Sequence, residues 1–232
     1  FVLNKEDHMG VTGQNGVGKS TLIKILTGEI IPDEGQVKWQ NKIDVGYLDQ
    51  YAKLAPGVTI RGFLRTAFDD LYKKEKELNE LYTKYAENGD DALLEKAGKI
   101  QTYLEENNFY DIDTEIEQVA AGLGLADLGY DHDVSKLSGG QRSKIILAKL
   151  LLQSPDVLVL DEPTNYLDVS HIDWLVDYLN NFSGAFIVVS HDYDFLGRIT
   201  NCIIDIDFGT ITRYTGALKQ ALRQKAANRE TY

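Results

Sequence analysis

Nine residues near the start of the chain combine three glycines with a lysine and two hydroxyl side chains, in the order Gly-Gln-Asn-Gly-Val-Gly-Lys-Ser-Thr. This spacing is typical of a phosphate-binding P-loop, in which glycine backbone turns several N–H groups towards one anion and the following helix adds its dipole. We therefore predict a nucleoside triphosphate site at Gly13, Gln14, Asn15, Gly16, Val17, Gly18, Lys19, Ser20 and Thr21. Lys19 would reach the β- and γ-phosphates, and the Ser20 hydroxyl would ligate Mg²⁺. The alternative is an ordinary glycine turn, and the apolar strand predicted at residues 9–12 weighs against it.

Other polar residues that could act on a phosphate group follow predicted strands. Apolar runs at residues 156–160 and 185–189 end at Asp161-Glu162 and at Ser190-His191-Asp192, and Gln50 follows a predicted strand at 43–48. In an open parallel sheet, ligands bind beyond the carboxyl ends of the strands. Phosphoryl transfer needs cations and a metal to hold charge, and a group that positions the nucleophile. Taken alone, Glu162 could cap a helix and His191 could be an ordinary surface imidazole.

Strands and helices alternate along most of the chain, and the strands are apolar without alternation. This pattern is typical of an α/β fold with a mainly parallel sheet covered on both faces. Further strands are predicted at residues 1–3 and 36–39, and an antiparallel hairpin at 202–206 and 210–214. A capping-box pattern at residues 114–117 predicts the start of another helix.

Residues 69–108 have a different character. Leu71, Leu78 and Leu81 recur at helical spacing, a turn follows at residues 88–91, and a second periodic arm ends near residue 108. The segment holds 6 lysines and 11 acidic residues, a formal charge of −5. We predict a helical hairpin, either a solvated pair or a docking element.

Composition limits the classes of protein to which the chain could belong. It has 232 residues, 43% of them apolar, with 24 basic and 36 acidic residues and a formal charge of −12. Such an acidic chain is a poor candidate for binding nucleic acid by bulk electrostatics, so any such contact would be local. The single Cys202 cannot form an internal disulfide, which suits a reducing cytoplasm.

The chain has no apolar run long enough to cross a bilayer and begins without the pattern of a signal peptide. Because it also begins without Met, we expect it to be part of a longer protein.

With the P-loop, Leu137-Ser-Gly-Gly-Gln141, Asp161-Glu162 and His191 in this order, the chain resembles an ATP-binding cassette (ABC) ATPase domain. The resemblance covers essentially everything except residues 69–108, and Leu-Ser-Gly-Gly-Gln is the family signature. It implies ATP and Mg²⁺ as ligands. By resemblance, Gln50 is the Q-loop glutamine near Mg²⁺, Asp161 the Walker B carboxylate that holds the metal, Glu162 the general base, Asp168 the D-loop aspartate and His191 the switch histidine.

The signature residues imply a partner. In this family Leu137, Ser138, Gly139, Gly140 and Gln141 act on nucleotide held by a second cassette, in the same full-length chain or in a homodimer. A lone domain would therefore bind ATP and turn it over slowly.

The segment Glu162-Pro-Thr-Asn-Tyr-Leu-Asp168 is similar to the Glu-Pro-Thr-Asn-His-Leu-Asp of ABC-F proteins, although Tyr166 departs from the usual His. ABC-F proteins carry two cassettes and no membrane domain, and bind the ribosome, where they contact rRNA and tRNA; some protect it from antibiotics. The resemblance implies an ATPase domain at residues 1–216 without its first strands, an inserted hairpin at 69–108, a helical subdomain at 109–155 and the start of an interdomain linker at 217–232. The acidic hairpin weighs against extensive RNA contact.

Three other functions stay open. The motor subunit of an ABC membrane transporter would accept a helix from a membrane partner. A non-catalytic regulator would use ATP binding alone, and Glu162 and His191 weigh against it. A simple P-loop kinase would have no use for the signature.

Overall fold

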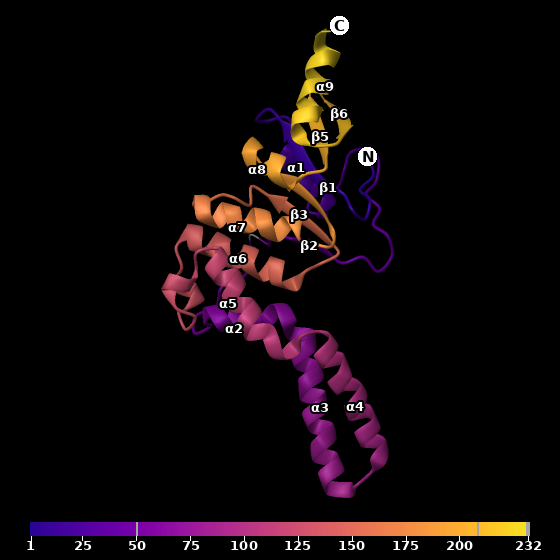
Figure 1. Ribbon diagram of the computed structural model, residues 1–232, viewed down its shortest axis with the longest axis vertical. Helices are drawn as coiled ribbons and strands as arrows, with labels where there is room; N and C mark the ends of the chain where they lie inside the picture. The colour runs from indigo at the N-terminus through magenta and orange to yellow at the C-terminus, as the bar shows by residue number, and fades with distance from the viewer. Residues whose placement is uncertain (50, 208, 231–232) are drawn as a thin grey trace. The chain divides into compact units, whose positions relative to one another are not determined.

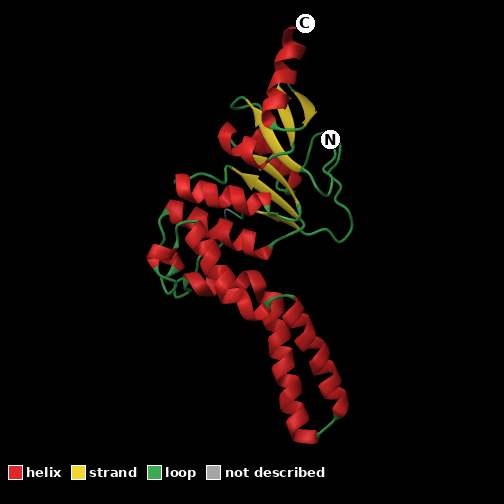
Figure 2. Ribbon diagram, in the orientation of Figure 1, coloured by secondary structure: helices red, strands yellow, loops and turns green. Residues whose placement is uncertain are grey.

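The computed structural model of the protein describes residues 1–49, 51–207 and 209–230, so Gln50 lies outside the described residues. The chain forms two compact units (Figure 1). The first comprises residues 1–52 and 154–232, and the second comprises residues 53–153. All the described strands belong to the first unit, whereas the described elements of the second are helical (Figure 2).

The first unit is built on a six-stranded sheet, counted over the described residues, in the order β2-β3-β4-β1-β5-β6. Neighbouring strands are parallel except β5 and β6, which form an antiparallel pair. This arrangement confirms the predicted α/β class and the hairpin near the C-terminus. The strands are β1 (His8–Gly13), β2 (Val45–Tyr47), β3 (Val157–Asp161), β4 (Ala185–Val189), β5 (Cys202–Asp207) and β6 (Thr210–Thr215).

The central strands form because their side chains are apolar on both faces. All five residues of β4 are buried, as are the first four of β3, which is expected for parallel strands covered by helices. Helix α1 (Lys19–Leu26) packs against β1 and β3, and α9 (Leu218–Glu230) packs against β5 and β6. The remaining helices of this unit are α7 (Val169–Asn180) and α8 (Tyr193–Ile199).

The strand register brings the carboxyl ends of β1, β3 and β4 to one edge of the sheet. Asp161 at the end of β3 pairs with Val189 at the end of β4, and Val189 also pairs with Val11 of β1. The loops that follow these strands therefore start side by side.

Two predicted strands and one predicted helix start are wrong. Residues 1–3 and 36–39 lie in no strand, because among the described residues no strand lies beside them to supply backbone hydrogen bonds. The strand predicted at 43–48 is limited to β2, because the Asp44 N–H is held by the Asp156 side chain at 2.9 Å. The helix predicted from Thr114 already begins at Ile112, because Ile112 and Ile116 bury the same face.

In the second unit, α3 (Asp69–Asn88) and α4 (Asp91–Glu106) run side by side as the predicted helical hairpin (Figure 1). Gly89, with φ 67°, ends α3, and the Asp90 side chain accepts a hydrogen bond from the Ala92 N–H to start α4. The buried apolar residues of the pair are Leu78, Ala97, Ile100 and Leu104.

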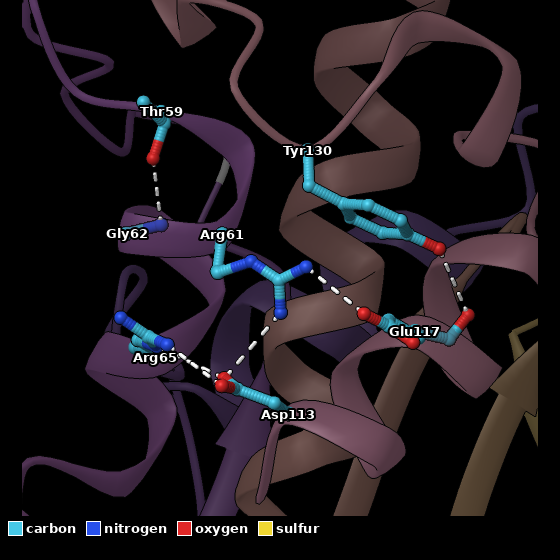
Figure 3. A network of polar contacts seen from close by, with 7 residues as sticks. All are labelled: Thr59, Arg61, Gly62, Arg65, Asp113, Glu117 and Tyr130. Carbon is cyan, nitrogen blue, oxygen red and sulfur yellow. Dashed lines mark hydrogen bonds and ion pairs between the residues drawn. The ribbon is translucent and has the colours of Figure 1, made fainter.

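A polar network joins two other helices of this unit, α2 (Ile60–Arg65) and α5 (Ile112–Gly122) (Figure 3). Arg65 forms two hydrogen bonds with Asp113, at 2.7 and 3.0 Å, and Arg61 donates to Glu117 at 2.9 Å. The Arg61 guanidinium also lies 4.9 Å from the Tyr130 ring centroid. Because the hydrogen bonds from Arg65 favour the charged carboxylate, they lower the pKa of Asp113.

Among the described residues, no helix has both the length and the apolar character needed to cross a membrane.

Candidate nucleotide-binding site

The P-loop connects β1 to α1 through backbone conformations that favour glycine. Gly18, directly before α1, has φ 108°, and Gly13 has φ 151°. A Cβ on Gly13 would lie 2.6 Å from the carbonyl oxygen of Ile206, so no larger residue fits there without displacing β5. Gly16 and Gly18 have open space where a Cβ would stand, so the loop can approach a ligand with backbone alone at these two positions.

The start of α1 has the features of an anion site. Gly18 is its N-cap and supplies no side-chain hydrogen bond to the first turn, which leaves that turn without a side-chain cap. The Lys19 side chain is buried, and its ammonium donates to the Gly13 carbonyl oxygen at 2.5 Å. Lys19 thus lies folded along the loop, with its positive charge next to the backbone that would enclose a phosphate.

Asp161 and Glu162 follow directly at the carboxyl end of β3. The Glu162 N–H donates to the Val189 carbonyl oxygen at 2.8 Å, which ties this turn to the end of β4. Glu162 has φ 49°, in the left-handed region that non-glycine residues seldom adopt. Strained backbone of this kind concentrates at functional sites, where the surrounding structure holds a side chain in one direction.

His191 connects Glu162 with the P-loop. Its Nε2 lies 2.8 Å from Asn15 Oδ1, and its Nδ1 forms an ion-pair contact with Glu162 Oε1. The backbone N–H of His191 donates to Glu162 Oε2 at 3.3 Å. Glu162 Oε1 is buried, and apart from this contact with His191 it has no hydrogen-bond partner among the described residues.

These residues surround one cavity of about 310 Å³. It is lined by Asn15, Gly16, Gly18, Lys19, Ser20, Thr21, Asp161, Glu162, Val189 and His191. The structure thus brings together the P-loop, Asp161, Glu162 and His191. Gly13, Gln14 and Val17 belong to the loop but are not among the lining residues. Sequence reasoning missed Val189, whose only signal was its place as the last residue of a buried strand.

The side chains in the cavity fit a triphosphate and a magnesium ion by their chemistry. Lys19 and the first turn of α1 provide positive charge and N–H donors, which suit phosphate. The Ser20 hydroxyl and the Asp161 carboxylate provide hard oxygen ligands, which suit Mg²⁺.

Asp168, the predicted D-loop residue, lies at the start of α7. It is the N-cap of α7, where its side chain accepts hydrogen bonds from the His171 N–H at 3.0 Å and the Ser170 hydroxyl at 2.8 Å. Asp168 is not among the residues that line the cavity. Its neighbour Tyr166 has φ 66° and is 66% exposed.

The signature residues lie in the second unit, at the start of α6 (Gly139–Gln153). The Ser138 N–H donates to Gln141 Oε1 at 2.9 Å, and the Gln141 N–H donates to Ser138 Oγ at 3.2 Å. This reciprocal pair is a capping box, a local role that the Ser-Gly-Gly-Gln spacing could have predicted and that sequence reasoning missed.

Comparison with known proteins gives consistent matches. A family model described as "ABC transporter" matches residues 1–165. The chain is 49% identical over 223 residues to the uncharacterized ABC transporter ATP-binding protein YfmM of Bacillus subtilis, covering 95% of this chain and 43% of that protein. It is 35% identical over 219 residues to the energy-dependent translational throttle protein EttA of Escherichia coli K12, covering 94% of this chain and 39% of that protein. The chain thus spans less than half the length of these relatives.

Solved structures show the same fold. A structure described as the ATP binding subunit of an ABC transporter matches with a TM-score of 0.66 and 18% identity, over 97% of this chain and 85% of that one. An RNase-L inhibitor matches with a TM-score of 0.63 and 24% identity, over 97% of this chain and 38% of that one.

Proposed function

Since the chain belongs to the ATP-binding cassette family, which includes the ABC-F protein EttA, we propose that it binds and hydrolyses Mg-ATP as one cassette of a cytoplasmic translation factor. The observation that carries the nucleotide part is the single cavity lined by Lys19, Ser20, Asp161, Glu162 and His191. These side chains come from a P-loop and from the ends of two other strands, as a phosphoryl-transfer site requires.

The binding half of the site acts through charge and oxygen ligands. Lys19 would exchange its hydrogen bond to the Gly13 carbonyl for the β- and γ-phosphates, and the first turn of α1 would donate N–H groups to them. Ser20 and Asp161 would hold Mg²⁺, with Gln50 as a further ligand. When bound, Mg²⁺ supplies positive charge that stabilises the phosphoryl group as it is transferred.

The reacting half depends on Glu162 and His191. Glu162 presents a buried carboxylate oxygen, Oε1, that contacts His191 Nδ1 in this structure, and once the His191 ring turns to the γ-phosphate this oxygen would accept a proton from the attacking water. The other oxygen is held by the His191 N–H, which fixes the direction of the side chain. The His191 ring, now against Asn15, would contact the γ-phosphate.

The signature segment at residues 137–141 supports the participation of a second cassette in hydrolysis. Ser138 and Gly140 would act on nucleotide held by a second cassette, in the same longer protein or in a homodimer. Asp168 would lie at the interface between the two cassettes. ATP would close the two cassettes, and hydrolysis would open them.

The ribosomal role rests on the EttA relatives, on the segment at residues 162–168 and on the hairpin at 69–108. We propose domain boundaries of 1–216 for the ATPase domain and 109–155 for its helical subdomain, with 217–232 starting a linker. Because the hairpin is acidic, its contact with rRNA or tRNA would be limited to a few points.

The nucleotide-binding subunit of an ABC membrane transporter is the second candidate, because the YfmM relative is described as an ABC transporter ATP-binding protein. Sedimentation distinguishes the two. With ATP present, the full-length protein carrying Glu162→Gln should pellet with ribosomes, and a matched Glu34→Gln change at an exposed bend outside the hairpin should not trap it. Co-sedimentation with membranes instead of ribosomes would contradict the translation role and leave the ATPase role intact.

A further inference from the structure

A buried carboxylate lies within the sheet close to the P-loop. Asp205 of β5 is 5% exposed, and each of its oxygens has a partner. Oδ1 accepts a hydrogen bond from the Thr12 hydroxyl at 2.9 Å, and Oδ2 lies 2.7 Å from the Lys225 ammonium. Lys225 also lies 3.5 Å from Asp207 Oδ2. Asp205 therefore joins β1 to α9.

Thr12 is the residue that precedes the P-loop. It pairs with Asp205 in the sheet, and Gly13 pairs with Ile206. The Gly13 carbonyl oxygen holds the Lys19 ammonium. Gly13, whose carbonyl oxygen holds Lys19, is thus the residue directly after Thr12, which Asp205 holds.

Helix α9 places Lys225 against the sheet. Leu218 and Ala221 on α9 are 3% and 2% exposed, and the helix packs against β5 and β6 (Figure 1). Lys225 follows Ala221 by four residues, so both lie on one face of the helix. Its side chain is 23% exposed. Packing of α9 and formation of the Asp205 ion pair therefore occur together.

A carboxylate that is buried away from water is stabilised by its hydrogen-bond and ion-pair partners. Removing one partner of a buried ion pair leaves an uncompensated charge, which draws in water or rearranges its neighbours. Loss of Lys225 would therefore disturb Asp205, and with it the Thr12 hydroxyl and the start of the P-loop.

We propose that Asp205 and Lys225 are positioning residues that couple the packing of α9 to nucleotide binding at the P-loop. This inference rests on the proposed function, because it takes the P-loop as an Mg-ATP site. When α9 is packed, Asp205 holds Thr12 in place, and with it the backbone of Gly13 at the start of the P-loop. By reciprocity, nucleotide binding makes α9 pack more firmly. The packing of the proposed linker, which starts at residue 217, would then depend on whether nucleotide is bound.

The test measures the Kd of Mg-ATP for the full chain by titration calorimetry. Lys225→Met should raise the Kd about three- to tenfold, the range expected for loss of one buried polar partner. Lys219→Met removes one charge from the exposed side of the same helix and should change the Kd less than about twofold. Lys225→Arg restores the cation and should recover most of the affinity, whereas a Kd that stays as high as in Lys225→Met would contradict the role of the charge.

Hydrogen exchange provides the second readout. In the wild-type chain, Mg-ATP should slow the exchange of the amides of α9, and this effect should be absent in Lys225→Met. If Lys225→Met does not fold, Thr12→Val removes the hydroxyl from the other side of Asp205 with a similar shape, and should also raise the Kd.

The outcomes separate the two hypotheses. Wild-type chain that binds Mg-ATP, together with Lys225→Met and Thr12→Val variants of unchanged Kd, would overturn the coupling and leave the proposed function standing. Wild-type chain that fails to bind Mg-ATP would overturn the proposed function and the coupling with it.

Discussion

Replacing Glu162 with Gln should stop hydrolysis and preserve nucleotide binding. Gln has the same shape, tolerates the φ of 49° about as well as Glu, and its amide oxygen can still accept the His191 N–H. The change removes the proton acceptor at a side chain that is only 19% exposed. Loss of a positioned general base lowers turnover by about 10²–10⁴-fold, equivalent to about 3–5 kcal/mol of transition-state stabilisation.

The assay compares phosphate release and Mg-ATP affinity for the wild type, Glu162→Gln and the matched Glu87→Gln, at a high concentration of the chain so that pairs can form. Glu87 lies exposed at the end of α3, so its change should alter neither quantity. Hydrolysis by Glu162→Gln at the wild-type rate would refute the assignment of the general base. A loss of affinity equal to the loss of turnover would refute it as well, because the residue would then be needed for binding.

Three further predictions concern pairing, acid stability and packing. If a second cassette completes the site, ATP turnover per chain should rise with chain concentration, and a normal rate that does not depend on concentration would contradict this. Hydrogen bonds from the Gly57 and Ser135 backbone and the Ser135 hydroxyl lower the pKa of Asp133 from 3.8 to about 2, so this carboxylate stabilises the fold above about pH 4 and loses its effect as the pH falls towards 2. Asp133→Asn should therefore flatten the acid limb of stability against pH in urea titrations, and an unchanged limb would contradict the role of these bonds. Leu104→Ala in the hairpin should cost about 2–5 kcal/mol of unfolding free energy, because Leu104 is fully buried, whereas Leu94→Ala at a 38% exposed site should cost much less; equal costs would contradict the packing of α3 on α4.

The sequence predicts the parts of the fold that depend on burial and local pattern. The apolar runs before Asp161 and Ser190 are strands, as expected. Their side chains are apolar on both faces, which is typical of parallel strands that helices cover on both sides. The hairpin of α3 and α4 follows from its periodicity and from the turn around Gly89. The convergence of Lys19, Glu162 and His191 follows from the rule that strand carboxyl ends share an edge.

Other features depend on partners that a single segment does not reveal. Polar and apolar side chains alternate at residues 36–39, but in the described part of the chain no strand pairs with them. The hydrogen bond between Thr12 and Asp205 joins residues 193 positions apart, and no local pattern predicts it. An acidic residue within the apolar run of β5 was nevertheless a signal, because a buried carboxylate requires partners.

The central claim is that the P-loop, with Lys19 at its centre, binds Mg-ATP. Calorimetric titration of the wild-type chain and of Lys19→Ala with ATP, with and without Mg²⁺, tests it most directly. We predict one Mg²⁺-dependent site per chain, weakened about 10- to 100-fold by loss of the lysine's charged hydrogen bonds. Equal binding by the wild type and Lys19→Ala, or no binding by either, would contradict the account.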